Sequence, residues 1–302
     1  MKVIIKSLDL HSIGQQTVTN PMEVVENDIR SFQESIRNHS EYDFTEYSIT
    51  SLRRRLTKIL LEYDMNMVQL TQKLGTDPFF LEKTVKKLTV HTTELFRDPK
   101  IWTKLRKELL PSLRDRSFIH IWHPGCSTGQ EIYSMMMVLE DLGMLDKAYL
   151  YGSDINPDVL ETAKLGRYKY HFNQSYLENF DRVILNGTGE TRADQKKHWK
   201  KYFTIDETRD YIQMKEFLCL KPVYKKLDLV KDSNLFLVKF DLIVCRNVII
   251  YFNNELQNKV FDLFYENLNY GGTLLLGVHE SIMGPFSKRF VKKDPFYHKM
   301  PV

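Results

Sequence analysis

The chain has 302 residues, of which 42% are apolar and 27% charged, and its formal net charge at pH 7 is +4. A chain of this length can bury a substantial core, and no apolar run approaches the roughly 20 residues that cross a bilayer. The opening "MKVIIKSLDLHS" lacks the apolar region and cleavage site of a secretory signal. We therefore expect a cytoplasmic protein without membrane insertion, and the modest charge argues against a dedicated nucleic-acid binder.

Cysteines and histidines give no sign of a metal site. Cys126, Cys219 and Cys245 lie far apart and form no C-x-x-C pair, which excludes a disulfide framework and a cysteine zinc site. His120 and His123 bracket the end of an expected strand, but no carboxylate or cysteine stands at ligand spacing from them. We expect both histidines to pack or cap, and no metal to bind.

The first part of the chain has a helical pattern. Apolar residues recur at spacings of three and four in "PMEVVENDIRSFQESIRNHS" and again in "SITSLRRRLTKILLEYDM". A further helical stretch, "MVQLTQKLGTDPFFLEKTVKKL", is broken at Gly75 and at the Asp77-Pro78 step. These segments predict a small all-helical domain over residues 1–90.

After the helix "KIWTKLRKELLPSLRDR", strands alternate with helices. Five strands are expected, in "SFIHIW", "AYLYGSD", "PVYKKLDL", "FDLIVCRN" and "GTLLLGV", and we expect helices to join them. This order predicts a doubly wound, mostly parallel α/β sheet over residues 91–302, with ligands at the carboxyl ends of its strands. The final "FVKKDPFYHKM" predicts a hairpin that turns at Asp294-Pro295 and can add an antiparallel edge.

One segment is too long for such a sheet. More than fifty residues separate "AKLGRY" from "PVYKKLDL", where a single helix suffices. Alternation in "KKYFTIDETRDYIQMK" predicts an antiparallel hairpin with its turn at "DETRD". A loop of this length in a compact domain is usually functional or disordered, so we expect an inserted β-subdomain at about residues 167–220.

The turn after the first strand, "HPGCSTGQE", decides the class of ligand. It has neither the G-x-G-x-x-G spacing nor the lysine with which proteins cradle diphosphates. Glu131 stands just inside the following helix, where it would oppose a phosphate. We expect an uncharged or cationic ligand near Gly125.

The second strand ends at Asp154, about thirty residues after Gly125. An acid at this position typically accepts the ribose hydroxyls of an adenosine group. Nicotinamide enzymes and S-adenosylmethionine methyltransferases share this feature, but a sulfonium cofactor has no phosphates and suits the acidic turn. The alternative is that Asp154 only caps the helix that begins near Pro157.

Several motifs together resemble the CheR-type chemotaxis receptor methyltransferases. They are, in order, "YDFTEYSITSLRRRL", "TTELFRDP", "GCSTGQEIYS", "SDINPDVLETAKLGRY", "FDLIVCRNVIIYF" and "GGTLLLGVHES". The resemblance covers about residue 24 to about residue 300. It implies a class I S-adenosylmethionine methyltransferase fold, S-adenosylhomocysteine as product, and transfer of methyl groups to glutamates on the cytoplasmic helical domains of receptors.

The resemblance also implies site residues. Arg97 and Tyr251 fall at the reacting centre. Positions that contact the cofactor fall on His91, Thr93, Arg97, Gly125, Glu131, Asp154, Asp228, Leu229, Cys245, Arg246 and Asn247. His91 and Asp228 replace residues that are asparagine in the family pattern, so we expect a retuned cofactor affinity.

Two alternatives and three further expectations remain. The chain can be a catalytically silent signalling scaffold that keeps the fold, or a nicotinamide-dependent oxidoreductase. Arg53, Arg54 and Arg55, with Lys58, predict a basic helical face, which either meets acidic receptor helices or is only solvated. We expect a monomer, and we leave open whether the insertion docks a receptor tail peptide by strand addition.

Overall fold

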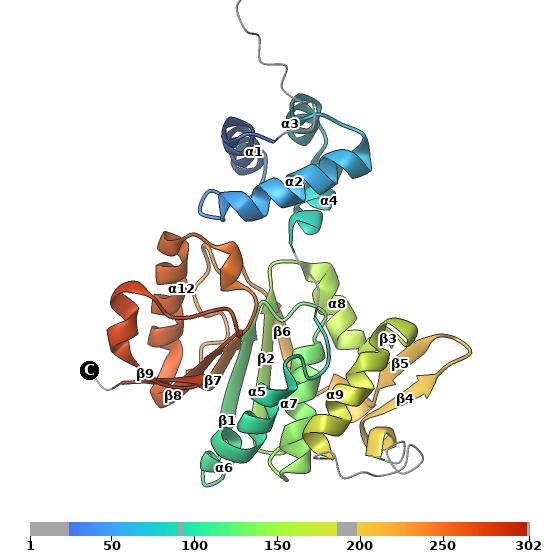
Figure 1. Ribbon diagram of the computed structural model, residues 1–302, viewed down its shortest axis with the longest axis vertical. Coiled ribbons are helices and arrows are strands. Elements are labelled where there is room, and N and C mark those ends of the chain that lie inside the picture. Colours follow the sequence, from blue (N-terminus) through green and yellow to red (C-terminus); the bar gives the residue numbers. More distant parts are fainter. Residues whose placement is uncertain (1–23, 90–92, 186–197, 301–302) are drawn as a thin grey trace, which may run out of the picture.

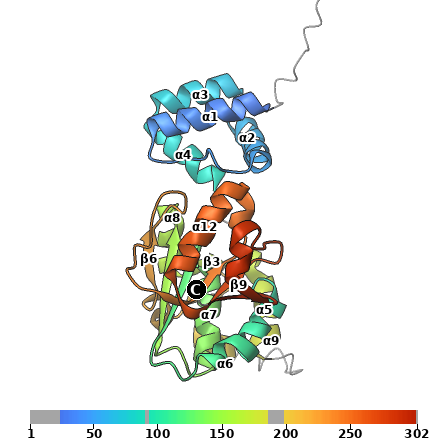
Figure 2. The same ribbon diagram turned by 90° about the vertical axis from the view of Figure 1, so that its left-hand side faces the viewer.

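The computed structural model describes residues 24–89, 93–185 and 198–300. Four helices gather at one end of a larger α/β body, and a small second sheet lies beside that body (Figures 1 and 2). Within these ranges no helix has both the length and the apolar character that a membrane crossing requires.

The N-terminal helices bury one face each into a shared core, as their apolar spacing predicted. They are α1 (Glu26–His39), α2 (Ile49–Tyr63), α3 (Met67–Thr76) and α4 (Pro78–Leu88). The predicted break is confirmed, because Asp77 ends α3 and its carboxylate accepts a hydrogen bond from Phe80 N at 2.9 Å to begin α4. Pro78 occupies the first position of α4, where its missing N–H costs nothing.

The large sheet has seven strands in the order β6-β2-β1-β7-β8-β10-β9. The strands are β1 (Ile119–Pro124), β2 (Ala148–Asp154), β6 (Val223–Lys226), β7 (Phe240–Cys245), β8 (Leu268–Leu276), β9 (Phe290–Lys293) and β10 (Phe296–Lys299). Neighbouring strands from β6 to β8 pair in parallel, and β10 is antiparallel to both of its neighbours. The mostly parallel sheet is confirmed, and the C-terminal hairpin extends it with its second strand innermost.

Side chains alternate between two cores, one on each face of the sheet. Ile121 of β1 packs on the face covered by the helices before β1 and by those after β1 and β2, whereas Trp122 packs on the face covered by α12. The helices of the first face are α5 (Pro99–Lys104), the π-helix η1 (Leu105–Leu109), α6 (Leu110–Ser112), α7 (Gln130–Asp141) and α8 (Pro157–Leu165). The second face carries α12 (Asn254–Asn267).

One connection differs from the expected alternation of strands and helices. Residues 227–239, between β6 and β7, form turns and extended chain instead of a helix. Phe236 and Leu227 of this link still bury their side chains in the core beside α12. A link that packs in this way covers the sheet without helical hydrogen bonds. Two short 3-10 helices, η3 (Ile249–Tyr251) and η4 (Gly284–Arg289), follow β7 and β8.

The insertion forms a three-stranded antiparallel sheet in the order β3-β5-β4. The hairpin predicted from alternation is present as β4 (Phe203–Asp206) and β5 (Tyr211–Met214). Sequence reasoning missed its third strand, β3 (Arg167–Lys169), and the helices of the insertion. These include η2 (His171–Asn173), α9 (Gln174–Ile184) and α11 (Glu216–Cys219), and residues 198–202 are also helical. The domain limits themselves stay predictions.

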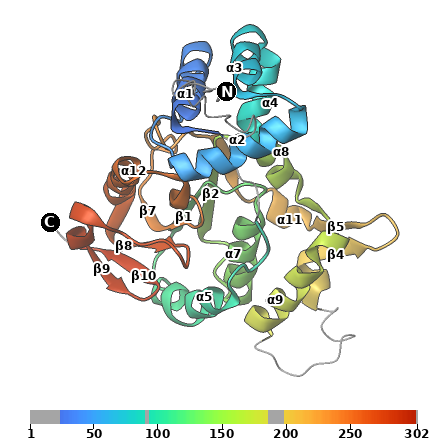
Figure 3. The same ribbon diagram turned by 45° about the horizontal axis from the view of Figure 1, so that its top comes forward.

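Backbone hydrogen bonds join the N-terminal helices to the α/β body. Ser48 N donates to Tyr251 O at 2.8 Å, and Asn253 N donates to Glu46 O at 2.9 Å. Tyr47 also forms a bridge with Phe252, and their ring centroids lie 5.1 Å apart. These contacts hold α2 above the large sheet (Figure 3).

The cap of α4 gives a first test of the fold. Asp77→Ala should lower the free energy of unfolding by about 1 kcal/mol, because Phe80 N loses its acceptor. Asp77→Asn keeps an acceptor oxygen and should keep most of that stability. Urea denaturation measures both variants, and an equal loss in both would contradict the cap.

Candidate functional site

The turn after β1 is shaped by close packing. Gly125 has φ +66°, and a Cβ there would lie 2.5 Å from Val248 Cγ2. Gly129 has φ +88°, and a Cβ there would lie 2.8 Å from Ala163 Cβ. Ser127 between them also has a positive φ, of 51°. The glycines therefore let the turn fit closely against the loop after β7 and against α8.

Asp154 ties this turn to the end of β2. Its Oδ2 accepts from Ser127 N at 2.9 Å and its Oδ1 accepts from Asn156 N at 3.0 Å. The cap of α8 is Asn156, whose side chain accepts from Asp158 N at 2.9 Å. The cap interpretation of Asp154 is therefore wrong.

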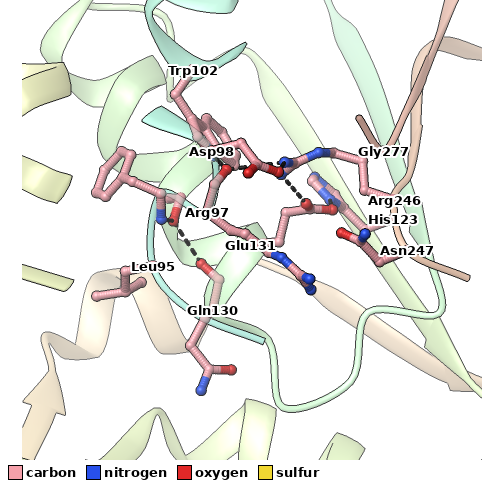
Figure 4. A network of polar contacts seen from close by, with 12 residues as sticks. Leu95, Arg97, Asp98, Trp102, His123, Gln130, Glu131, Arg246, Asn247 and Gly277 are labelled. Carbon is pink, nitrogen blue, oxygen red and sulfur yellow. Dashed lines mark hydrogen bonds and ion pairs between the residues drawn. The ribbon is translucent and has the colours of Figure 1, made fainter. Parts of the chain in front are cut away.

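A buried cation links three parts of the site. The side chain of Arg246 is 1% exposed, and Figure 4 shows it between two carboxylates. Its Nη1 donates to Glu131 Oε2 at 2.8 Å and its Nη2 donates to Asp98 Oδ2 at 2.6 Å. The same Nη2 donates to the backbone oxygen of Arg97 at 3.0 Å. Arg246 thus fixes the start of α7, the segment before α5 and the end of β7 relative to one another.

Glu131 remains ionised in this setting. Burial by itself would raise the pKa of Glu131, but the hydrogen bond with His123 and the guanidinium of Arg246 lower the pKa below its ordinary value of 4.5. His123 is fully buried, and its Nδ1 lies 3.2 Å from Glu131 Oε1. His120 instead stacks on Tyr149. Within the described ranges, no group of three or more His, Cys, Asp or Glu side chains could hold a metal.

Asp228 presents an unusual buried acceptor. Its Oδ1 accepts from Val230 N at 2.9 Å, whereas its Oδ2 is buried without a hydrogen-bond partner among the described residues. Burial raises the pKa of Asp228 above its ordinary value. A buried oxygen without a donor costs stability, so this oxygen suits a ligand that brings an N–H group.

These residues surround one cavity of about 280 Å³, close to the lower end of the roughly 300–1,000 Å³ of small-ligand sites. Its walls come from the strand ends and from the N-terminal helices. Ten predicted site residues line it, namely Thr93, Arg97, Gly125, Glu131, Asp154, Asp228, Leu229, Arg246, Asn247 and Tyr251. Cys245 does not, because its side chain packs in the core beside α12. His91 lies outside the described residues.

The N-terminal helices supply a part of the cavity that sequence reasoning missed. Tyr47, Ser51 and Arg55 line it, and the guanidinium carbon of Arg55 lies 4.8 Å from the centroid of the Tyr251 ring. The three consecutive arginines do not form one basic face. Arg53 Nε donates to Val24 O at 3.0 Å and Arg54 is exposed, whereas Arg55 faces the cavity. Helical spacing separates neighbouring residues by about 100°.

Comparison with known proteins identifies the family. Residues 91–295 match the family described as CheR methyltransferase, SAM binding domain. The chain belongs to the CheR methyltransferase family. It is 33% identical over 277 residues to a Pseudomonas putida protein named as a methyltransferase, Cher3, with 90% of this chain and 96% of that protein covered.

Two further relatives carry the name chemotaxis protein methyltransferase. The relative from Listeria innocua is 25% identical over 277 residues, with 91% of this chain and 97% of that protein covered. The relative from Borreliella burgdorferi is 31% identical over 224 residues, with 68% of this chain and 72% of that protein covered. The chain is therefore a chemotaxis-type methyltransferase, and the oxidoreductase alternative is set aside.

The cofactor of this CheR family member is S-adenosylmethionine, and its own residues fit that group. Asp228 and Asp154 both line the cavity, which places two acceptors near the ends of β6 and β2, and Asp228 Oδ2 has no hydrogen-bond partner among the described residues. The turn at Gly125 has no lysine and is followed by the ionised Glu131, which suits a cationic sulfonium compound.

The Arg246 cluster gives a pH-dependent prediction. The folded pKa of Glu131 lies below its ordinary 4.5, so its stabilising effect is present above that pH and is lost as the pH falls through the folded pKa. Glu131→Gln should lower the free energy of unfolding at pH 7 by roughly 1–3 kcal/mol. The difference in the free energy of unfolding between wild type and variant should become smaller below about pH 4.5.

Denaturant titrations from pH 7 to pH 3.5 measure this gap. Glu255→Gln is the control, because the side chain of Glu255 is 71% exposed and its nearest cation, Lys259, is 3.9 Å away. A gap of constant size at every pH would show that Glu131 acts through packing instead of charge.

Proposed function

We propose that the chain transfers the methyl group of S-adenosylmethionine to glutamate side chains of chemotaxis receptors and forms methyl esters. The observation that carries this proposal is the make-up of one cavity, which is lined by the acids Glu131 and Asp154, by Arg55 and Arg97, and by Tyr251. Acids suit the sulfonium cofactor, and cations suit an acidic acceptor. The names of the Listeria and Borreliella relatives support chemotaxis as the setting.

The chemistry requires little from the protein. A glutamate side chain has an ordinary pKa of about 4.3 and is already an anionic nucleophile at neutral pH. The bound cofactor supplies an electrophilic methyl carbon, so a C–O bond forms while the C–S bond breaks and its electron pair leaves with sulfur. No proton moves, and no general base is required. The residues have to align the two reactants and exclude water.

Cofactor-binding roles follow from the acceptors along the cavity. Asp154 is proposed to accept the ribose hydroxyls. Asp228, whose Oδ2 has no hydrogen-bond partner among the described residues, is proposed to accept the adenine amino group beside Leu229. Glu131, held ionised by His123 and Arg246, is proposed to face the methionine end. The backbone of Arg97 is fixed by hydrogen bonds from Trp102 and Arg246, which places its side chain on the cavity wall.

The acceptor glutamate is proposed to meet Arg97 and Arg55. Both line the cavity, and Arg55 reaches it from α2 of the N-terminal helices. Tyr251, which contacts Arg55, orients the methyl-bearing end. The proposed partners are the cytoplasmic helical domains of receptors, so the reaction takes place in the cytoplasm. The monomeric state stays a prediction, and docking of a receptor tail at the insertion stays open.

Transfer of labelled methyl groups tests the function. The purified chain and S-adenosylmethionine labelled in its methyl group should label receptor cytoplasmic domains, and mild base should release the label, as expected for an ester. Receptor domains with the acceptor glutamates changed to glutamine are the control and should take up little label. Binding of S-adenosylhomocysteine without label on any receptor would favour a silent scaffold.

Asp154 gives a sharper test of the cofactor site. Asp154→Asn should weaken S-adenosylhomocysteine binding by roughly 10- to 100-fold, because a charged acceptor for two hydroxyls is lost. Asp158→Asn is the matched control, since that carboxylate is exposed and pairs with Lys86 away from the cavity lining. Isothermal titration calorimetry compares them, and equal affinities would contradict the ribose assignment.

A further inference from the structure

The loop after β7, residues 246–252, forms one wall of the cavity. Arg246, Asn247, Val248, Ile250 and Tyr251 all line it. Asn247 has a left-handed backbone with φ 60°, a conformation that residues other than glycine adopt at some cost in free energy. A segment with such a backbone keeps its shape only if its surroundings hold it.

A single carboxylate holds this loop from behind. Glu280 Oε2 accepts from Asn247 N at 2.7 Å and from Gly277 N at 2.7 Å. Glu280 Oε1 accepts from Val248 N at 2.9 Å and from Ile250 N at 3.3 Å. Three of these four donors belong to the cavity wall, although Glu280 itself does not line the cavity.

Burial of the carboxylate of Glu280 costs free energy. It is 8% exposed, and within the described part of the chain it forms no ion pair with a lysine, arginine or histidine. Burial raises the pKa of Glu280, while the backbone donors act in the opposite direction. A buried carboxylate without a cation lowers stability unless its hydrogen bonds are made. Here three of its four hydrogen bonds go to the backbone that carries the wall, and the fourth goes to Gly277 N.

The loop is held on its other sides as well. Val248 packs against Gly125 so closely that a Cβ on that glycine would lie 2.5 Å from Val248 Cγ2. The backbone oxygen of Tyr251 accepts from Ser48 N at 2.8 Å. Contacts with Glu280, with the glycine turn and with the residue before α2 therefore all restrain the loop.

We propose that Glu280 is a positioning residue for methyl transfer, which sets the path of residues 247–251 and through it the place of Tyr251. The inference rests on the proposed function. Asp154 ends β2 and Asp228 follows β6, and these two strands lie on the opposite side of β1 from β7. A change at Glu280 therefore moves the methyl-transfer end of the cavity and leaves the adenosine end in place.

Glu280→Gln keeps the shape of the side chain but replaces one carboxylate oxygen by an NH2 group, which cannot accept hydrogen bonds from the backbone N–H groups. We expect the kcat for receptor methylation to fall roughly 10- to 100-fold, because small misplacements of reacting groups are costly. The affinity for S-adenosylhomocysteine should fall by no more than about threefold, because Asp154 and Asp228 keep their places and Asn247 is the only predicted cofactor contact on residues 247–251. Glu280→Asp keeps the charge and should recover part of the kcat. Glu255→Gln, an exposed glutamate in α12, should change neither quantity.

Two measurements separate positioning from a general loss of structure. In a double-mutant cycle with Tyr251→Phe, Glu280→Gln should lower the kcat much less than it does alone, because both changes act on one group. Amide hydrogen exchange of residues 247–251 should be at least about tenfold faster in Glu280→Gln, with no comparable change in the N-terminal helices. This exchange measurement needs neither a receptor nor turnover.

The outcomes are distinct. If wild type methylates no receptor, the proposed function fails, and exchange still shows whether Glu280 holds the loop. Unchanged exchange in Glu280→Gln would overturn the inference whatever the activity. Faster exchange with an unchanged kcat in an active enzyme would also overturn it, as would full additivity with Tyr251→Phe.

Discussion

The buried guanidinium of Arg246 is the constraint on which the rest of the site depends. It is fully enclosed and divides its donors between Glu131, Asp98 and the backbone oxygen of Arg97. Glu131 lies at the start of α7, Arg97 and Asp98 lie together before α5, and Arg246 itself follows β7, so one cation fixes three segments that the sheet alone would leave adjustable. A buried charge is tolerated only when its partners are in place, so the whole arrangement depends on every one of them.

Carboxylates perform two different tasks around this cation. Glu131 and Asp154 lie on the cavity wall, while Glu280 stays behind it and receives the N–H groups of the loop after β7. Asp154 combines both tasks, because it also accepts from the backbone of the glycine turn. The acids thus organise the backbone of a CheR-type site and also provide hydrogen-bond acceptors for its ligands.

The N-terminal helices complete the site. Arg55 reaches the ring of Tyr251 from α2, and backbone hydrogen bonds at Tyr251 and at Asn253 join the two parts of the chain. Because the N-terminal helices and the α/β body both form its walls, the cavity admits an acceptor side chain only where these two parts meet. This shape fits a reaction in which water has to be kept away from the transferred methyl group.

The sequence by itself predicted much of the fold and of the cofactor site, because local patterns of residues carry this information. Apolar spacing gave the N-terminal helices and the five parallel strands, and the acidic turn at Glu131 together with Asp154 indicated a cofactor without phosphates. Ten of the predicted site residues do line one cavity, since parallel strands deliver their carboxyl ends to one edge.

The tertiary structure decided which side chains face each other across distant segments. Three neighbouring arginines look alike in sequence, yet only Arg55 among them lines the cavity, because the helix turns each in a different direction. Cys245 belongs to a matching motif but points into the core, since alternate residues of β7 face opposite sides of the sheet. Glu280 lies about thirty residues along the chain from the loop that it holds, and no sequence periodicity links them. Contacts of this kind exist only once the sheet has brought the ends of β7 and β8 together.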